Sequence, residues 1–536
     1  MQFAMAFKII GVLLMLFSSA MLPSLFLSLV QRDGVESAFA SGFGVTLLAG
    51  VVLWLPTRSL KRDLNIRDGF LVTALFWLVL GTFGAIPFWL NPALNLSAAA
   101  SVFESISGLT TTGATVITGL DSLPQSLLLY RQLLQWLGGI GIVVLAVAIL
   151  PMLGIGGMQL YRAESAGPSK ERKLTPRITS TAKALFGIYL LLTTACGASY
   201  YFAGMTAFDA ICHAFSTVAI GGFSTHDASL GFYDQNSVLL ISSFFMVISA
   251  INFGLHFIAI QRRDIRVYTH DSETAFFLTV IGLATCVICV LLVFTETFSV
   301  EDSLIHGLFQ TISIATTTGF TTQDFSVWPL FLPVLLLMLS FMGGCVGSTG
   351  GGMKAMRILL IFRQGVRELR QLLHPNAVIP LKIDSRRVQT EIISAVWSFF
   401  AVYMFCFVSI WLALLATGLD FSSAFSAVAA SLNNLGPGLG EVASTYARVS
   451  EAGKLILCLA MLMGRLEVFT LLVPKTHLLS GPRQPHSAGR PFANRLTGRN
   501  KQRQTRYRPL TFSVEHIGNP ARTIRSFTER ASGPSA

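Results

Sequence analysis

The sequence predicts an all-α integral membrane protein in which two spanning helices precede four repeated units of helix, re-entrant loop and helix. Of its 536 residues, 52% are hydrophobic and only 12% are charged, whereas soluble domains are closer to a quarter charged. Apolar runs of about 20 residues, the length that a helix needs to cross a bilayer, recur from residue 9 to residue 474. Between them, a short glycine-bearing polar stretch occurs four times.

The apolar runs predict ten spanning helices. We interpret the first, 9–30, as a retained span rather than a signal peptide, because it is long and an equally apolar run, 39–56, follows it. These two make up a first segment, 1–68. The other eight form pairs: 69–90 with 126–153, 184–204 with 236–260, 274–297 with 327–346, and 390–417 with 452–474. The pairs define repeat 1 (69–183), repeat 2 (184–273), repeat 3 (274–389) and repeat 4 (390–474).

Each pair encloses a moderately apolar segment that is too short to span, at 97–112, 206–221, 302–318 and 421–435. Each segment ends in a polar stretch: LTTTGATV (109–116), VAIGGFST (218–225), ATTTGFTT (315–322) or NNLGPGLG (433–440). This pattern is typical of a re-entrant helix followed by non-helical backbone. Such backbone is stable at membrane depth only where it lines water or packs against protein.

The four polar stretches align on one glycine each, at Gly113, Gly222, Gly319 and Gly436, with separations of 109, 97 and 117 residues. In three repeats a serine stands six positions before this glycine, and in three a hydroxyl residue stands two positions after it. In three repeats another glycine stands 28 positions after it, at Gly141, Gly347 and Gly464. A glycine lets a backbone carbonyl turn inward through a conformation that a Cβ would oppose. One such stretch could be a simple turn, but four favour a pore.

The chemistry of these stretches favours a monovalent cation. A permeating ion must exchange its water for fixed oxygens without binding too tightly to leave. The four stretches contain no ring of carboxylates, so the field is one of neutral dipoles, which suits a weakly hydrated monovalent ion better than calcium or magnesium.

The distribution of charge predicts the orientation. Of the Lys and Arg residues, 22 fall at Lys8 or in the loops 57–68, 154–183, 261–272 and 354–390, and we expect these on the cytoplasmic side with the N-terminus. The opposite loops hold only Arg32, Arg131, Arg448 and Lys454.

The C-terminal segment 475–536 carries 12 Lys and Arg and has no apolar periodicity. We expect a disordered cytoplasmic tail that touches anionic lipid, or a sequence altered by a shifted reading frame. Without it the net charge falls from +12 to +2, so the basic composition is no argument for nucleic acid as a partner.

The stretches SISGLTTTGATV, AIGGFST, TTTGFTT and SLNNLGPGLGEV, with RQLLQWLGGIGIVVLAVAILPMLGIGG and FMGGCVGSTGGGMK, resemble the TrkH family of bacterial Trk potassium uptake systems, within the Trk/Ktr/HKT superfamily. The resemblance covers about residues 1–474. It implies a K⁺-channel-like pore with pseudo-fourfold symmetry in the bacterial inner membrane, K⁺ as the transported ion and no organic cofactor. It also implies a homodimer with one pore per protomer, gated by a cytosolic nucleotide-binding (RCK-type) regulatory subunit.

The resemblance also assigns residues. In the family a serine at the first filter glycine is associated with sodium passage, so glycine at all four positions here favours K⁺. Repeat 4 departs most, with Asn433 and Asn434 in place of threonines and Pro437 after the glycine, which is itself a family trait. The filter carbonyls are expected from four segments, which we call the filter segments: Thr111, Thr112 and Gly113; Ile220, Gly221 and Gly222; Thr317, Thr318 and Gly319; Asn434, Leu435 and Gly436.

A second feature is the stretch GGCVGSTGGGMK, residues 343–354, which we call the intramembrane loop. It has six glycines in ten residues, and glycine costs roughly 1 kcal/mol per residue in a helix relative to alanine, so the helix should unwind here. The family resemblance implies a gate that obstructs the ion path below the filter. Its residues are Gly343, Gly344, Gly347, Ser348, Thr349, Gly350, Gly351, Gly352 and Lys354.

Arg465 lies within the last apolar run, where a cation costs about 2.5–3.5 kcal/mol on insertion scales and is usually paired or functional. Our hypothesis is that Arg465 contacts exposed carbonyls of the intramembrane loop, or Ser348 and Thr349, and repels cations until the gate moves. The alternatives are a salt bridge with Glu467 or a side chain that snorkels to the cytoplasmic face.

Other polar residues receive structural roles. Glu104, nine residues before Gly113, is predicted to brace the filter through hydrogen bonds, and Asp209 and Asp302 to cap helices. His213 and His306 are interpreted as packing or hydrogen-bonding residues. The seven cysteines lie in apolar stretches and are predicted to be buried thiols rather than disulfide partners or metal ligands. For the pair Cys286 and Cys289, core or lipid-facing thiols are favoured over a redox site.

The sequence offers less support for three other functions. A secondary K⁺ symporter coupled to H⁺ or Na⁺ is the nearest alternative, but four units in one orientation favour a pore over an inverted repeat. An intramembrane enzyme is disfavoured because the sequence has no HExxH, GxSxG or paired intramembrane aspartate motif. A receptor or structural role leaves the four filter segments unexplained.

Overall fold

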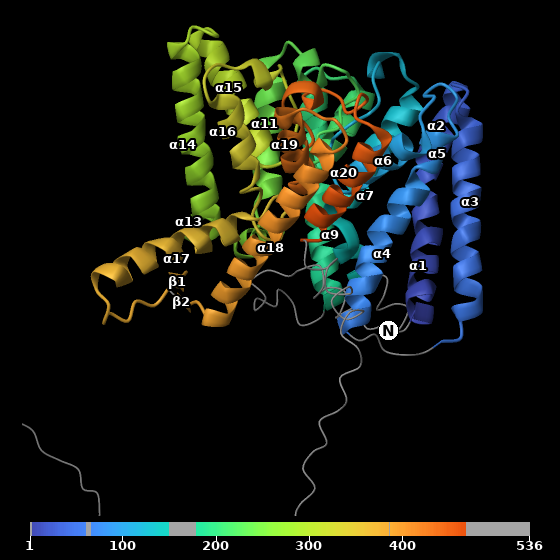
Figure 1. Ribbon diagram of the computed structural model, residues 1–536. Helices are drawn as coiled ribbons and strands as arrows, with labels where there is room; N and C mark the ends of the chain where they lie inside the picture. Colours follow the sequence, from blue (N-terminus) through green and yellow to red (C-terminus); the bar gives the residue numbers. More distant parts are fainter. Residues whose placement is uncertain (1–2, 61–65, 149–177, 385, 468–536) are drawn as a thin grey trace, which may run out of the picture. The chain divides into compact units, whose positions relative to one another are not determined.

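Helices make up almost all of the regular structure in the computed structural model (Figure 1). The structure describes residues 3–60, 66–148, 178–384 and 386–467, all of which belong to one unit that spans Met1–Gly481. The predicted tail 475–536 and most of the basic loop 154–183 lie outside the described residues.

Two spanning elements precede the repeats. The first consists of α1 (Phe3–Ser18), a short 3-10 turn and α2 (Leu22–Gln31), and the second is α3 (Glu36–Trp54). Helices α1 and α3 pack closely because glycines face each other: a Cβ at Gly50 would lie 2.8 Å from the carbonyl oxygen of Gly11. Because glycine has no side chain, the two backbones can approach each other closely at this point, as is common between membrane helices.

The four repeats share one order of elements. Repeat 1 contains α4 (Ile66–Gly84), α5 (Ile86–Trp89), α6 (Ala98–Leu109) and α7 (Gln125–Ala148); repeat 2 contains α9 (Ile178–Phe202), α10 (Ala207–Ala219), α11 (Asn236–Ala250) and α12 (Phe253–Arg262). After the short helix α13 (Arg266–His270), repeat 3 contains α14 (Ser272–Phe294), α15 (Val300–Ala315), α16 (Leu332–Ser340) and α17 (Ala355–Leu373). Strands β1 (Lys382–Ile383) and β2 (Arg386–Arg387) form an antiparallel hairpin, and repeat 4 contains α18 (Thr390–Leu415), α19 (Phe421–Leu432) and α20 (Glu451–Arg465).

Six segments of the described chain are long and apolar enough to cross a membrane: Ala4–Gln31, Glu36–Thr57, Val72–Trp89, Lys183–Phe202, Ser272–Phe294 and Thr390–Leu415. They are the two N-terminal elements and the first helix of every repeat. The sequence predicted ten spanning helices; among the described residues, the second helices of the repeats are not long and apolar enough as single helices, and α11 with α12 is so only as a bent pair. The second helices end or bend at glycines, or at a residue whose side chain caps the start of a new helix.

The breaks have local causes. Helices α11 and α12 meet at 94°, because Asn252 starts a new helix by accepting a hydrogen bond from the backbone N–H of Gly254 at 2.8 Å. Helix α16 ends at Ser340, just before the glycine-rich intramembrane loop, so the predicted span 327–346 is not a single helix. Helix α7 is interrupted at Gly141, whose φ of 55° a helix does not permit.

The four short helices α6, α10, α15 and α19 match the predicted re-entrant segments. Each begins at a residue whose side chain accepts a backbone N–H of the first turn, namely Ser97, Thr206, Ser299 or Asp420. Asp209 and Asp302 were predicted as caps, but they stand three residues later and accept hydrogen bonds from the capping hydroxyls of Thr206 and Ser299. They stand at the third position of the helix and hold the capping hydroxyl in place, instead of acting as the cap.

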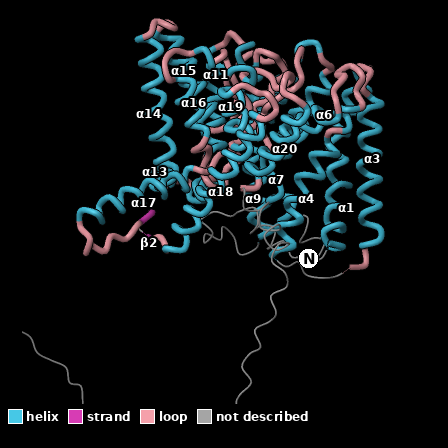
Figure 2. Tube along the Cα trace, viewed as in Figure 1, coloured by secondary structure: helices cyan, strands magenta, loops and turns pink. Residues whose placement is uncertain are grey.

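The two ends of the helical unit differ. The loops after the short helices gather at the end opposite the N-terminus, as Figure 2 shows. Helix α13, helix α17 and the hairpin lie at the same end as the N-terminus (Figure 1).

All seven cysteines fall within the described residues, and all are free. Six are buried as predicted, but Cys286 is exposed on the outer face of α14, beside the exposed Leu283 and Val287. An apolar sequence environment does not separate a core position from one that faces lipid.

Candidate functional site

The four filter segments adopt the same backbone conformation. Each central glycine has positive φ, at 81°, 78°, 84° and 102° for Gly113, Gly222, Gly319 and Gly436. Two residues earlier, four residues that are not glycine also have positive φ: Thr111, Ile220, Thr317 and Asn434, at 56°, 55°, 68° and 54°. Such residues are uncommon, and persist only where the surrounding structure fixes them.

Hydrogen bonds fix them in the same way in every repeat. The N–H of the residue before the glycine donates to a carbonyl in the last turn of the preceding short helix: Thr112 to Ser107, Gly221 to Ser216, Thr318 to Ser313 and Leu435 to Ala430, at 2.7–2.9 Å. In a trans peptide the C=O points opposite to the N–H. The carbonyls of Thr111, Ile220, Thr317 and Asn434 are therefore turned away from the helix ends.

The filter segments also contact one another in cyclic order. A Cβ on each glycine would collide with the carbonyl oxygen before the next glycine: Gly113 with Gly221 at 2.1 Å, Gly222 with Thr318 at 2.1 Å, Gly319 with Leu435 at 2.0 Å and Gly436 with Thr112 at 2.6 Å. The order runs from repeat 1 through repeats 2, 3 and 4 and back to repeat 1, so the contacts close into a ring. No side chain fits at any of the four positions without displacing a neighbouring carbonyl.

A buried ion pair supports the ring in repeat 1. The Glu104 carboxylate accepts hydrogen bonds from the Thr115 hydroxyl at 3.0 Å, the Val116 N–H at 2.9 Å and Arg131 Nε at 2.8 Å. The side chains of Glu104 and Arg131 are 0% and 1% exposed. Arg131 was predicted in an external loop, and this was wrong, because it lies within α7. Its guanidinium also donates to the Ser224 carbonyl at 3.0 Å and so ties repeat 1 to repeat 2.

Two residues of the same helix were missed by sequence reasoning. Gln132 Nε2 donates to the Phe223 carbonyl at 2.9 Å, and Gln135 Nε2 donates to the Gly221 carbonyl at 2.6 Å. With Arg131 they line one face of α7 against the filter segment of repeat 2. The signal for them was the polar spacing in RQLLQW at the start of an otherwise apolar run.

Histidines hold the chain just beyond the ring. His213 hydrogen bonds to the Asp209 carbonyl and to the Ser224 hydroxyl, both at 2.9 Å, and His306 bonds to the Thr322 hydroxyl at 3.0 Å. His226, which sequence reasoning did not single out, joins repeat 2 to repeat 1: its Nδ1 lies 2.6 Å from Asp121 Oδ1, and its Nε2 lies 3.6 Å from Asp209 Oδ1.

The intramembrane loop packs directly against the filter segment of repeat 3 and against residues just before the filter segments of repeats 2 and 4. The Thr349 hydroxyl donates to the Val218 carbonyl at 3.0 Å, the Gly351 N–H to the Thr317 hydroxyl at 2.7 Å, and the Gly352 N–H to the Asn433 carbonyl at 2.9 Å. The loop thus touches repeats 2, 3 and 4. A Cβ at Gly351 would lie 2.0 Å from the Asn433 carbonyl oxygen, so glycine is required for this approach.

Arg465 connects the loop to repeat 1. Its guanidinium donates to the Thr349 carbonyl at 3.1 Å, the Thr111 hydroxyl at 3.2 Å and the Gly139 carbonyl at 3.0 Å. The carboxylate of Glu467, the alternative partner considered from the sequence, pairs with Arg357. Lys354 Nζ donates to the Gly350 carbonyl and closes the end of the loop on itself.

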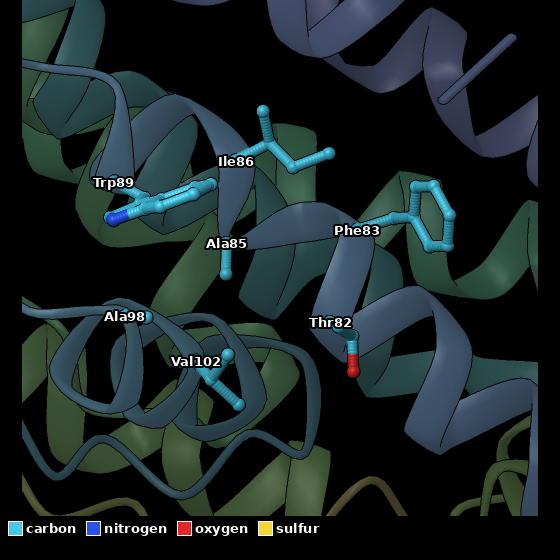
Figure 3. Close-up of a pocket in the computed structure, with 7 residues that line it drawn as sticks. All are labelled: Thr82, Phe83, Ala85, Ile86, Trp89, Ala98 and Val102. Carbon is cyan, nitrogen blue, oxygen red and sulfur yellow. The ribbon is translucent and has the colours of Figure 1, made fainter. Parts of the chain in front are cut away.

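The ligands that these groups could offer to a cation are oxygens without charge. Within the described ranges, no group of three or more His, Cys, Asp or Glu side chains is arranged to hold a metal ion. A cavity of about 240 Å³ lies apart, between α4, α5 and α6 (Figure 3), but its walls, which include Phe83, Trp89 and Val102, are almost entirely apolar. This cavity has no donor set for a cation.

The model that describes the TrkH family, "Cation transport protein", matches residues 35–483. The chain belongs to the TrkH family. It is 53% identical to the "Trk system potassium uptake protein TrkH" of Salmonella typhimurium over 475 residues, which cover 88% of this chain and 98% of that protein. It is 54% identical to the protein of the same name from Vibrio parahaemolyticus over 476 residues, with the same coverage.

A solved structure agrees with the fold. The "Crystal Structure of the Potassium Transporter TrkH from Vibrio parahaemolyticus" superposes with a TM-score of 0.81 at 52% identity, over 88% of this chain and 98% of that one. The chain is thus a multi-pass, all-helical membrane protein of a bacterial transporter family, and not an enzyme, as the sequence predicted. The family match ends at residue 483, so most of the basic C-terminal segment lies beyond it.

The Glu104–Arg131 pair of this TrkH-family chain generates a stability prediction. Glu104→Ala leaves a buried guanidinium without its carboxylate, which typically costs roughly 3–5 kcal/mol. Glu368→Ala removes the exposed partner of the Arg367–Glu368 pair and should cost about 0–1 kcal/mol. Thermal melting of the two purified variants in detergent measures the contrast, and equal shifts in melting temperature would show that the buried pair does not hold the structure.

The His226–Asp121 contact generates a pH prediction. Burial lowers the pKa of His226, but the neighbouring carboxylates of Asp209 and Asp121 raise it more, so the pKa lies above its ordinary value of 6.5. The hydrogen bond to His226 in turn lowers the pKa of Asp121. Stabilisation by the protonated histidine is therefore complete below about pH 6.5 and is lost as the pH rises through the raised pKa.

The measurement is the difference in melting temperature between the unsubstituted chain and His226→Gln across that pH range. The difference should be largest at acidic pH and shrink as the pH rises. His270→Gln, at an exposed position of α13, serves as the control and should give no such trend. A difference that is constant with pH would argue against a charged His226.

Proposed function

We propose that this chain is the pore-forming, channel-like subunit of a Trk system and carries K⁺ across the bacterial inner membrane. The observation that carries the proposal is the closed ring of four glycines and four carbonyls, with separations of 2.0–2.6 Å between each glycine's Cβ position and the neighbouring oxygen. Membership of a cation transport family supports it, and so do the potassium transporters among the relatives.

The ring suits K⁺ for a physical reason. Four segments around one axis, in a K⁺-channel-like pseudo-fourfold arrangement of the repeats, present neutral carbonyl dipoles that replace the water around the ion. The backbone conformation of these segments is the same in all four repeats and is fixed by the same hydrogen bond to the preceding helix. The oxygens are therefore held at set positions. Glycine in all four repeats favours K⁺ over Na⁺ in this family.

The intramembrane loop is proposed as the gate. It lies against the filter segments, and Arg465 anchors it through the Thr349 carbonyl and brings a positive charge beside the Thr111 hydroxyl. A cation on the ion path repels K⁺ until the loop and the arginine move. We infer that a cytosolic nucleotide-binding (RCK-type) subunit drives this motion, and that the transporter is a homodimer with one pore in each protomer.

The proposed orientation puts the filter segments toward the outside and the basic segments in the cytoplasm. It is supported by the excess of Lys and Arg at the end of the helical unit that carries α13, α17 and the hairpin (Figure 1). The incoming ion then meets the ring first and the intramembrane loop second.

The proposed filter is tested by Gly113→Ser. Its side chain would start 2.1 Å from the Gly221 carbonyl oxygen and displace it, so the variant should lose its preference for K⁺ over Na⁺ and most of its K⁺ uptake. Gly119→Ser is the matched control, because Gly119 also has positive φ, 74° against 81°, but has no backbone atom within 4 Å of its Cβ position.

The measurement is uptake of K⁺ or Rb⁺, with Na⁺ as competitor, in a bacterium that lacks its own K⁺ uptake systems. The unsubstituted chain and Gly119→Ser should restore growth on low K⁺. Full rescue by Gly113→Ser with unchanged selectivity would refute the filter assignment.

The proposed gate is tested by Arg465→Ala. Loss of the guanidinium releases the loop and removes its charge, so Rb⁺ uptake without the regulatory subunit should rise several-fold. Arg465→Lys keeps the charge but lacks the forked donors of arginine. Its basal Rb⁺ uptake should therefore lie between that of the unsubstituted chain and that of Arg465→Ala. Arg448→Ala, at an exposed position of repeat 4, should leave uptake unchanged. Basal uptake that Arg465→Ala does not alter would count against the gate.

A further inference from the structure

Glu273 joins the two ends of the intramembrane loop. It stands in the first turn of α14 and is only 3% exposed. Its Oε1 accepts a hydrogen bond from the Val346 N–H at 2.7 Å and another from the Met356 N–H at 3.1 Å. Val346 lies near the start of the loop and Met356 just after its end. One side chain therefore holds together two points that are ten residues apart in the sequence.

The loop has few side chains with which to fix its own shape. Six of its residues are glycine, and Gly343, Gly347 and Gly352 have positive φ. Glycine-rich backbone gains more conformational freedom on release than any other, so the closed arrangement depends on contacts supplied from outside the loop. A buried carboxylate is stable only when its hydrogen bonds are made, so Glu273 and the two amides stabilise each other.

Repeat 4 shows that a glutamate at the start of a repeat's first helix need not be buried. Glu391 is the second residue of α18, as Glu273 is the second residue of α14. Both glutamates stand at a helix N-terminus, where a negative charge is favourable. Glu391 is exposed, whereas Glu273 is buried against the loop. The contrast assigns the burial of Glu273 to the loop contact.

Glu273 also lies near the β1–β2 hairpin and α13, at the end of the helical unit where the N-terminus is found (Figure 1). The N–H of the preceding residue, Ser272, donates to Asp384 Oδ1 in the turn of the β1–β2 hairpin at 3.0 Å. The short helix α13 leads directly into α14, and its Tyr268 hydroxyl contacts His256 Nδ1 of α12 at 2.9 Å. Motion of the hairpin or of α13 therefore displaces the start of α14, and with it both ends of the loop.

We propose that Glu273 is a positioning residue for the gate: it latches both ends of the intramembrane loop and transmits movement of the hairpin and of α13 to the loop. The proposal rests on the function of the loop as a gate, as proposed above, and adds the contact through which a cytosolic partner acts on it. Release of the latch frees Val346 and Met356 together, so the loop loosens at both ends at the same time.

The experiment combines two measurements on the full chain. The first is basal Rb⁺ uptake in a bacterium that lacks its own K⁺ uptake systems and the regulatory subunit. The second is the rate at which a thiol reagent applied from the cytoplasmic side modifies Cys345, which lies in the loop and is 0% exposed, in a chain whose other six cysteines are replaced by serine or alanine. Cys345→Ala in that chain gives the background labelling.

Glu273→Ala removes both hydrogen bonds and should raise Cys345 modification and basal uptake about tenfold, the factor that corresponds to one hydrogen bond with a charged partner. Glu273→Gln keeps a carbonyl acceptor at the same place and should stay near the unsubstituted chain. Glu273→Asp is one methylene shorter and should raise both rates by a smaller factor. Glu391→Ala is the matched control and should change neither rate.

Unchanged Cys345 modification in Glu273→Ala would overturn the latch, as would an equal increase in Glu273→Gln. If Glu273→Ala does not reach the membrane, Glu273→Asp decides in the same way. If Cys345 modification rises while Rb⁺ uptake stays at its basal level, the latch stands and the proposed role of the loop as gate fails.

Discussion

The structure depends on one steric constraint: four segments of backbone meet so closely that none of them can carry a Cβ at its central residue. Each of Gly113, Gly222, Gly319 and Gly436 faces a carbonyl oxygen of the next repeat. Backbone in this arrangement cannot form helix or sheet, so its polar groups must be satisfied by protein. The capped short helices, the α7 side chains that bind the repeat 2 segment, and the continuous first helices around them all serve that requirement.

The contacts of the intramembrane loop depend on the same steric constraint. The absence of a Cβ also lets the intramembrane loop approach the filter segments, at Gly351 beside the Asn433 carbonyl. The loop is then held by groups from outside it, with Arg465 on the side of repeat 1 and Glu273 at the two ends. A segment that has little rigidity of its own, and is fixed by a few hydrogen bonds, is suited to two arrangements that differ by a small free energy.

The sequence predicted the features that recur and, among those that occur once, the unwound glycine-rich loop and its contact with Arg465, but it missed several others. The spacing of the four glycines and the four short helices was readable because each repeat carries the same pattern. The break between α11 and α12 was not, since Asn252 sits in an apolar run and only its packing shows that it caps a helix. Charge counting placed Arg131 in a loop because composition does not distinguish a solvated cation from one paired with a buried carboxylate. Glu273 was overlooked because its partners are backbone amides, which leave no mark in the sequence.

We propose that K⁺ passes through the ring of four glycines and four carbonyls. The most direct measurement is anomalous X-ray diffraction from crystals of the protein in which K⁺ is replaced by Rb⁺ or Tl⁺. We expect anomalous peaks inside the ring, between the carbonyls of Thr112, Gly221, Thr318 and Leu435. A protein that transports Rb⁺ but shows no peak there, or shows its peaks at another site, would contradict it.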